Sequence, residues 1–401
     1  MSIGTSVSST PHQIFKRRRP RCALIEFNYY HGETMPTIVR CLNALGADVQ
    51  VYCNERLRHN DPFVYTQGLS YGLHDVEDLS GDDLNNALSE FDLVIINSLE
   101  PKENLTKVKG LQMPVIGVMH NGGLAITDRD YADFFGAPSR KALVMARHIS
   151  DFISQRTNVQ WISPIELGTV RDPLPATGFV TFCVQGNLHA DRRNYGALVN
   201  AVSSITARGI KNFKVLIIGR NDTATGDALR EAIRSRHLDA FFEFSEGELR
   251  YFDYYGSIAR SDFLLPLVDP NLSDHAAYFR DKLSTTMQIA LAFQIIPIVH
   301  GDLATAYGVE NESFTYSTNW LSRLNLSKMR GGLKRAMLAA LNAPQEDLVR
   351  MRSGLSRKRD ELLNHSTENL RSLLDELTIG ESRKPNSSAE ANPERHAHPH
   401  N

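Results

Sequence analysis

The sequence predicts an α/β protein in which two doubly wound domains face a central cleft and one long helix follows them. The chain has 401 residues, which suits two domains better than one. Short apolar runs alternate with helical patterns in two successive series, as parallel sheets covered by helices require. A stretch rich in Gly, Pro and Asp, 168–178, separates the two series.

Composition narrows the class of protein further. The hydrophobic share of 42% and the charged share of 22% are ordinary for a globular chain. The net charge of −2 gives no global field toward nucleic acid, so we expect no nucleic-acid partner. Apolar runs such as 263–268 are far shorter than the roughly 18 residues of a membrane-spanning helix. Residues 1–9 lack the apolar core of a secretory signal, and we therefore expect a cytoplasmic protein.

The two ends of the chain differ from the rest. Residues 1–20 form a basic lead-in that we expect to be disordered, with Lys16 and Arg17–Arg19 next to Arg21. Two interpretations stay open, a solvated segment or peripheral contact with an anionic membrane at the inner face. Residues 380–401 are rich in Pro, Asn, Ser and His and predict a disordered tail, in which we expect the three alternating histidines to be incidental.

The first series occupies residues 21–170, the predicted N-terminal acceptor domain. The expected strands are 22–28, 48–52, 93–97, 115–119 and 142–146, and a helix is expected over 36–45. Each strand is short and apolar, as strands buried on both faces of a parallel sheet should be. The four cysteines show no CxxC spacing, so neither a zinc knuckle nor a redox pair is indicated.

The second series occupies residues 176–343 and repeats the alternation. The expected strands are 179–184, 213–218, 241–244, 262–266 and 295–299, and the expected helices are 195–207, 226–237, 248–259 and 278–292. A long charged helix follows over 345–377, within the segment 344–378 that we expect to pack back across the first domain.

Several enzyme classes lose support because their motifs are missing. No G-x-G-x-x-G follows the first strand of either series, and the chain has no P-loop. It also lacks H-E-x-x-H and a G-x-S-x-G elbow after a strand. Dinucleotide-dependent oxidoreductases, P-loop enzymes and common hydrolases are therefore disfavoured.

Ligands of such folds bind at the carboxyl ends of the strands, and two loops of the first domain carry suitable groups there. His31 and Glu33 follow the first strand, and each is able to take a proton from a hydroxyl group. The alternative is a plain polar loop in which Thr34 caps the next helix. His120 follows strand 115–119 and precedes two glycines, so we expect it to project into the cleft.

In the second domain, cations gather after the strands. Gly186 and Asn187 follow the first strand, and Arg192 with Arg193 lies at the head of the next helix. Positive charge there opposes the helix dipole, which makes sense if a phosphate lies between them. Arg220 places another cation after strand 213–218.

A third group lies at the predicted start of helix 278–292. It comprises Tyr278, Asp281, Lys282 and Ser284. Asp281 is able to accept two ribose hydroxyls, and Lys282 with Ser284 is able to hold a diphosphate. The alternative is a solvated helix face, but the rest of this helix is apolar and rich in alanine.

Taken together, these features resemble the glycosyltransferases of the B-type fold (GT-B), which have two Rossmann-like domains. The resemblance is carried by the two βαβ series, the turn from Gly186-Asn187 to Arg192-Arg193-Asn194, and the Asp281-Lys282 pair before a helix that leads to Ile296-Pro297-Ile298. It covers about 21–377 and is nearest to the family 4-like bacterial enzymes. The segment 278–299 is similar to the sugar-nucleotide segment of fucosyltransferases and exostosin-like enzymes.

The resemblance implies a hexosyltransferase that moves a sugar from a nucleotide sugar to a glycan or lipid-linked glycan. It implies a donor on the second domain, with the diphosphate near Gly186, Arg192 or Arg193, and Lys282, and with Arg220 nearby. It also implies ribose at Asp281 and the donor sugar at His120. No D-x-D follows a strand, so we expect no metal or other cofactor and assign the leaving-group charge to these cations.

The chain departs from retaining members, which carry two glutamates eight positions apart before an alanine-rich helix. Here 287–292 contains no Glu, and Asp274 and Asp281 are too irregularly placed to replace the pair. Stereochemistry therefore stays open; if the reaction inverts, His31, Glu33 or His120 is the candidate base. Two alternatives also stay open, a sugar-nucleotide epimerase of the same fold and a non-catalytic binding or scaffold protein.

Overall fold

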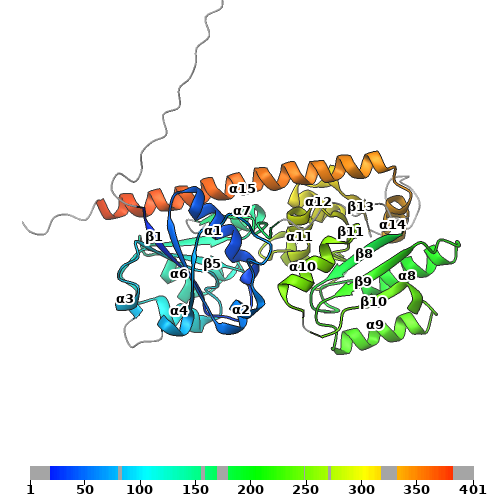
Figure 1. Ribbon diagram of the computed structural model, residues 1–401, viewed down its shortest axis with the longest axis horizontal. Helices are drawn as coiled ribbons and strands as arrows, with labels where there is room; N and C mark the ends of the chain where they lie inside the picture. The colour runs from blue at the N-terminus through cyan, green and yellow to red at the C-terminus, as the bar shows by residue number, and fades with distance from the viewer. Residues whose placement is uncertain are drawn as a thin grey trace, which may run out of the picture.

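The computed structural model has two α/β domains side by side, and a long helix, α15, runs along both (Figure 1). The structure describes residues 19–79, 84–154, 159–168, 179–247, 249–269, 272–317 and 332–382. The predictions for most of the basic lead-in, the stretch between the two series and the histidine-rich tail lie outside the described residues. Among the described residues, no helix is long and apolar enough to cross a membrane.

The first domain is built on a seven-stranded parallel sheet with the order β3-β2-β1-β4-β5-β6-β7. Its strands are β1 Arg21–Glu26, β2 Asp48–Cys53, β3 Gly72–Asp75, β4 Leu93–Ile96, β5 Val115–Met119, β6 Arg140–Val144 and β7 Val159–Trp161. Its helices are α1 Met35–Ala44, α2 Glu55–Asn60, α3 Leu84–Ala87, α4 Lys102–Val108, α5 Leu124–Thr127, α6 Arg129–Phe135 and α7 Arg147–Ile153, with 3-10 turns η1 Gly32–Thr34 and η2 Val76–Leu79. Neighbouring residues Leu24 and Ile25 belong to the cores on opposite faces of the sheet, so both faces are covered.

The second domain has a six-stranded parallel sheet with the order β10-β9-β8-β11-β12-β13. Its strands are β8 Val180–Gln185, β9 Phe213–Ile218, β10 Phe242–Phe244, β11 Phe263–Leu264, β12 Ile296–His300 and β13 Phe314–Tyr316. Its helices are α8 Tyr195–Thr206, α9 Ala224–Arg234, α10 Tyr251–Ala259, α11 Thr285–Phe293, α12 Gly301–Tyr307 and α14 Leu333–Leu341, with 3-10 turns η3 Asp239–Phe241, η4 His275–Phe279 and η5 Glu310–Glu312. The fold class predicted from the sequence is confirmed by these two doubly wound sheets.

Helix α15, Gln345–Ser382, joins the cores of both domains. Its buried Leu355 and Leu363 belong to the core of the second domain, whereas Leu370 and Leu373 belong to that of the first. Arg359 of this helix also lies 3.4 Å from the Glu166 carboxylate in the chain that leaves β7. The helix therefore packs over the first domain and contacts the second as well.

The helix expected over 278–292 is wrong in its first part. Residues 275–279 form the 3-10 turn η4, and the α-helix begins only at Thr285. The intervening backbone is held by the first domain, because Lys282 forms an antiparallel bridge with Asn121 and the Gly122 N–H donates to the Asp281 carbonyl at 3.2 Å. Helix α10 likewise begins at Tyr251, later than expected, after Arg250 in an extended conformation.

Candidate active site

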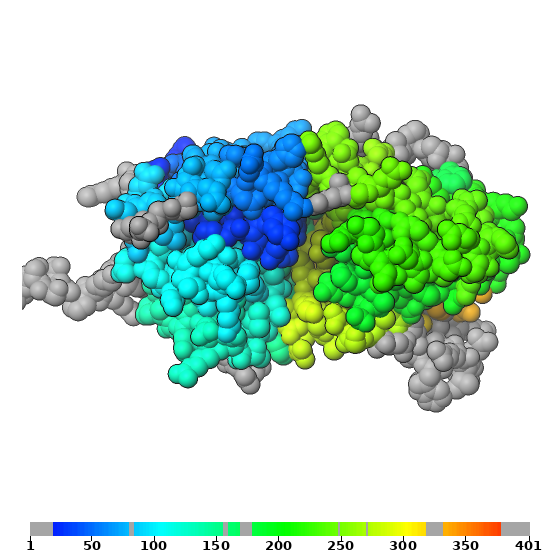
Figure 2. All heavy atoms as spheres, turned by 90° about the horizontal axis from the view of Figure 1, so that it is seen from below, coloured from blue at the N-terminus to red at the C-terminus, as the bar shows by residue number. Residues whose placement is uncertain are grey.

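Both sheets reverse their strand order at one place, and these two places face the domain boundary. The reversal lies between β1 and β4 in the first sheet and between β8 and β11 in the second. In doubly wound folds, ligands bind outside the carboxyl ends of the strands at such a point. The space-filling view shows a recess where the two domains meet (Figure 2). The loops that follow β1, β4, β5 and β8 therefore define the candidate site.

The loop after β1 brings His31 and Glu33 together. The His31 Nδ1–H lies 3.4 Å from Glu33 Oε1, and His31 adopts a left-handed conformation with φ 67°. Burial by itself lowers the pKa of His31, but the hydrogen bond and charge of Glu33 raise it overall. Burial would raise the pKa of Glu33, yet the same hydrogen bond holds it at about 2. With Nδ1–H bound to Glu33, His31 keeps Nε2 as the acceptor for a substrate proton.

His120 stacks on His31 but is chemically different from it. The two ring centroids are 3.7 Å apart at 25°. His120 Nε2 lies 2.9 Å from the Asn97 carbonyl oxygen, which only accepts, so this nitrogen carries the proton. Burial first, and then the charge of His31, lowers the pKa of His120 to about 3. His120 is therefore a neutral imidazole over the working pH range and is suited to hydrogen bonding.

Polar residues that the sequence analysis did not select surround these histidines. Glu26, at the end of β1, is fully buried and accepts hydrogen bonds from Asn97 Nδ2 at 2.7 Å and Ser98 Oγ at 2.5 Å. Burial raises the pKa of Glu26 to about 7. The Glu100 carboxylate accepts the backbone N–H groups of His120 and Asn121, which fixes the loop after β5. A carboxylate at the end of an otherwise apolar strand is the sequence signal that could have identified Glu26.

In the second domain, the turn after β8 holds Gly186, Asn187 and Arg193 together. Gly186 has φ 93°, and a Cβ there would lie 3.1 Å from the Arg193 guanidinium. Arg193 donates to the Asn187 carbonyl at 2.8 Å. Gly219 packs against this turn, because a Cβ on Gly219 would lie only 2.9 Å from the Gly186 backbone. The turn thus keeps a cation beside a backbone that carries no side chain.

Arg192 and Lys282 share one carboxylate. Arg192 Nε lies 3.5 Å and Lys282 Nζ 3.4 Å from Asp274 Oδ2, and both cations are partly exposed. One carboxylate between two cations leaves a net positive charge available to an anion. Arg220 is not part of this group, since its side chain is 67% exposed and pairs with Asp222 at 2.9 Å.

The remaining predicted donor residues lie nearby in different settings. Burial raises the pKa of Tyr278, and the charges of Arg193 and Arg192 oppose that effect. Asp281 pairs with Arg280 at 3.1 Å and lies against Gly123 of the first domain with 13% of its side chain exposed. Ser284 is buried, and its backbone N–H donates to the Tyr307 hydroxyl at 2.8 Å. Asp281 and Ser284 thus lie at the domain contact and helix start, and their ligand roles stay predictions.

Helix α10 connects the two halves of the site. The Tyr251 hydroxyl donates to Glu33 Oε2 at 3.2 Å across the domain boundary. Tyr254, one turn later, donates to Gln185 Oε1, next to Gly186. Residues three apart on a helix lie on the same face. The same face of α10 therefore contacts both the His31–Glu33 pair and the strand end that precedes Gly186.

Metal-type ligands converge at one other place among the described residues. His275, His300 and Asp302 form a group in the second domain, apart from the histidines of the first. No group of that kind lies at the His31–Glu33 pair in the described part of the chain.

The comparisons with known proteins concern the fold. No protein-family model matches the sequence, and no curated protein matches it. A glycosyltransferase from Rickettsia africae is similar in structure, with a TM-score of 0.60 and 11% identity over 90% of this chain and 99% of the other. HepE from Anabaena, in complex with UDP and glucose, has a TM-score of 0.59 and 9% identity over 89% and 100% of the two chains.

A third structure extends the likeness to a different transferase. The O-GlcNAc transferase mutant from Thermobaculum terrenum has a TM-score of 0.52 and 16% identity over 94% of this chain and 71% of the other. At such identities the likeness is one of fold. Two parallel sheets of Rossmann-like strand order and near-complete coverage of glycosyltransferase structures show that this chain has the GT-B fold.

Proposed function

We propose that the protein is a glycosyltransferase that moves a hexosyl group from a nucleoside-diphosphate sugar to a hydroxyl of a glycan or lipid-linked glycan. One observation carries the proposal: Tyr251 and Tyr254 of α10 contact Glu33 and Gln185, respectively, so one helix joins the His31–Glu33 pair to the turn that holds Arg193. The fold supports it, since HepE of the same fold was crystallised with UDP and glucose.

The second domain supplies the donor side of the reaction. Departure of a nucleoside diphosphate builds negative charge on the β-phosphate, and fixed cations stabilise that charge. Arg193 lies at Gly186, while Arg192 and Lys282 hold one carboxylate between them. We assign leaving-group stabilisation to these three cations and to the N–H groups at the start of α8, without a requirement for metal.

The first domain supplies the acceptor side. His31 Nε2 takes the proton of the acceptor hydroxyl while the Nδ1–H stays bound to Glu33, whose charge stabilises the imidazolium. The acceptor oxygen forms its bond to the anomeric carbon as the bond from that carbon to the phosphate oxygen breaks. The electron pair leaves on the diphosphate. Attack opposite to the leaving group inverts the anomeric centre, and the neutral His120 is placed to hydrogen-bond the transferred sugar.

The experiment is incubation with a panel of nucleoside-diphosphate sugars and glycan or lipid-linked acceptors. Release of nucleoside diphosphate and formation of a glycoside, with NMR to assign the anomeric product, are the readouts. His31→Asn should abolish transfer and keep donor affinity, because His31 lies on the acceptor side. His59→Asn, a change at an exposed histidine of α2, is the matched control and should keep full activity.

Two results would overturn the proposal. Interconversion of the donor sugar without transfer would indicate an epimerase of the same fold. Binding of no nucleotide sugar at all would indicate a non-catalytic protein. A retained anomeric configuration would exclude His31 as the base, but it would not contradict the assignment of the donor-binding cations.

A further inference from the structure

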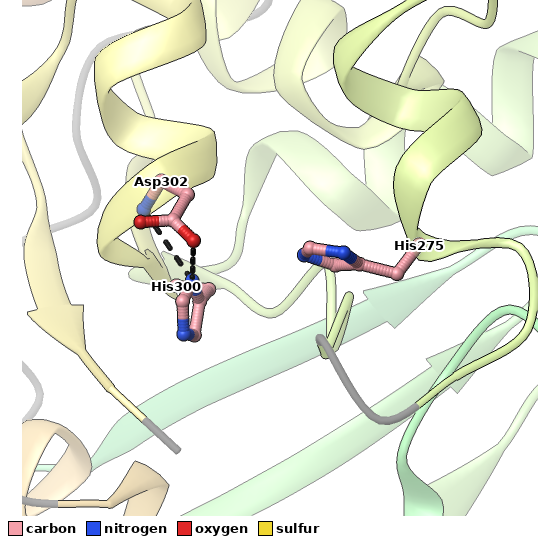
Figure 3. Close-up of side chains that lie close together, drawn as sticks. All are labelled: His275, His300 and Asp302. Carbon is pink, nitrogen blue, oxygen red and sulfur yellow. Dashed lines mark hydrogen bonds and ion pairs between the residues drawn. The ribbon is translucent and has the colours of Figure 1, made fainter. Parts of the chain in front are cut away.

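Two histidines and one aspartate converge in the second domain at a place that the proposed reaction does not use (Figure 3). His275 begins η4, His300 ends β12, and Asp302 lies in the first turn of α12. One ligand atom from each residue lies within 4.8 Å of the other two. The His275 ring extends from η4 toward His300 and Asp302 in the close-up.

Each histidine of this group has one ring nitrogen, Nε2, without an ordinary partner in the described part of the chain. His275 Nε2 and His300 Nε2 are both buried, and neither has a hydrogen-bond partner among the described residues. His300 is only 5% exposed as a whole. Buried polar atoms in native proteins nearly always have a partner, so an unpaired pair of this kind calls for an occupant. A buried histidine that only packs in the core would have a hydrogen-bond partner for each ring nitrogen.

Asp302 is already directed at one of these rings. Its carboxylate lies 3.5 Å from His300 Nδ1, and its backbone N–H lies 3.4 Å from the same atom. The Asp302 side chain is 67% exposed, so the group is closed by buried imidazole on one side and open to solvent on the other. Three protein ligands with one position left for water are a common arrangement for zinc.

We propose that His275, His300 and Asp302 bind one divalent transition metal ion, with Zn²⁺ as the expected species. Two imidazoles and one carboxylate suit zinc and its neighbours in the first transition row. Ca²⁺ and Mg²⁺ prefer sets made of oxygen ligands alone. The ligand atoms lie within 4.8 Å of one another, and η4 and the exposed Asp302 are able to bring them to the spacing of a coordinated ion because neither is part of the sheet.

The bound ion acts through the backbone that it connects. It joins η4 to the start of α12 and so fixes the residue before His275, which is Asp274. That carboxylate holds Arg192 and Lys282. The ion therefore fixes the position of the donor cations through Asp274, while the cations themselves stabilise the charge of the leaving group. The inference concerns metal binding and stands whether or not the protein transfers sugar.

The test measures Zn²⁺ binding to the full-length chain by equilibrium dialysis and calorimetry. Because His396, His398 and His400 are able to bind zinc by themselves, all measurements use a chain with these three changed to Ala. We expect one Zn²⁺ per chain. His275→Ala should weaken binding at least 100-fold, and Asp302→Asn about 10-fold. His59→Ala, at an exposed histidine, should leave binding unchanged.

Further readouts separate a built site from surface adsorption. Bound Co²⁺ should give the visible absorption of a four- or five-coordinate ion with nitrogen ligands, and His275→Ala should remove that absorption. Zn²⁺ should raise the melting temperature of the parent chain and not that of His275→Ala. Circular dichroism checks that both variants fold. Binding of no Zn²⁺, or binding that His275→Ala and Asp302→Asn leave unchanged, overturns the proposal, and the second result would indicate an adventitious ion only.

Discussion

Glu33→Gln tests the central chemical claim, that a carboxylate tunes His31 as the base. The substitution keeps the shape of the side chain and removes its charge. The pKa of Glu33 is held at about 2 against an ordinary 4.5, which corresponds to about 3 kcal/mol of favourable interaction for its ionised form. Most of that favourable interaction comes from His31, so the imidazolium should lose a comparable stabilisation in the variant.

The sign of the effect follows from the two shifts. Glu33 raises the pKa of His31, and burial opposes it. Without the carboxylate, the acidic limb of the kcat/KM profile should therefore move to lower pH. The plateau should fall by about 10- to 100-fold, since a weaker and less well oriented base loses part of the usual 10²–10⁴-fold contribution. The assay is the rate of nucleoside diphosphate release with acceptor, measured from pH 5 to 9.

Tyr251→Phe is the matched control for this measurement. It removes the other hydrogen bond to Glu33, at 3.2 Å, and leaves the charge in place. Its acidic limb should stay near the wild-type position even if the plateau falls. An unmoved limb in Glu33→Gln, with a plateau equal to that of the wild type, would refute the assignment of His31 and Glu33 as base and partner.

Four further predictions concern stability and donor binding. The raised pKa of Glu26, about 7 against 4.5, means that the folded state binds the extra proton, so the unfolding free energy should fall by about 3 kcal/mol from pH 4.5 to 7; denaturant titrations should show a flatter profile for Glu26→Gln. Lys282→Ala should weaken nucleoside-diphosphate binding by about 1.5–3 kcal/mol in calorimetry, and unchanged affinity would remove Lys282 from the site. Gly186→Ala should destabilise the fold by about 1–3 kcal/mol in urea, because φ is 93° and the new Cβ meets Arg193 at 3.1 Å. Leu373→Ala should cost about 2–5 kcal/mol in the same assay, since this side chain of α15 is fully buried in the first domain.

The central strands were predictable because burial on both faces leaves a continuous apolar run. Edge strands do not carry that signal. β3, Gly72–Asp75, was missed because it has one apolar residue, Leu73, and that side chain is 42% exposed. β7 has only three residues, Val159–Trp161. The start of α11 was misplaced because contacts with Asn121 and Gly122, far away in sequence, hold the backbone at Asp281 and Lys282.

The sequence predicted on which loops the candidate residues lie, and it did not predict the surroundings of each side chain. The rule that loops after parallel strands carry ligands selected His31, Glu33 and His120. It did not distinguish them, because the difference depends on which neighbour each ring meets. His31 meets the Glu33 carboxylate, whereas His120 donates to the Asn97 carbonyl and stacks on the His31 ring. The metal-type cluster was missed for the same reason, since His275 and His300 come from separate elements and share no spacing motif.

The proposed reaction requires the two domains to be in contact, because each domain supplies a different part of the site. The proposed base, His31, and its partner Glu33 belong to the first domain, whereas the cations belong to the second, so neither domain alone holds both. Tyr251 reaches Glu33 only when the domains are in contact, and the same contact places Lys282 beside Asn121. Helix α15 has buried leucines in both cores, so it holds the domains together at the opposite side while the loops meet. The orientation of the base therefore depends on the same contact that presents the cations, and an open form would lose both together.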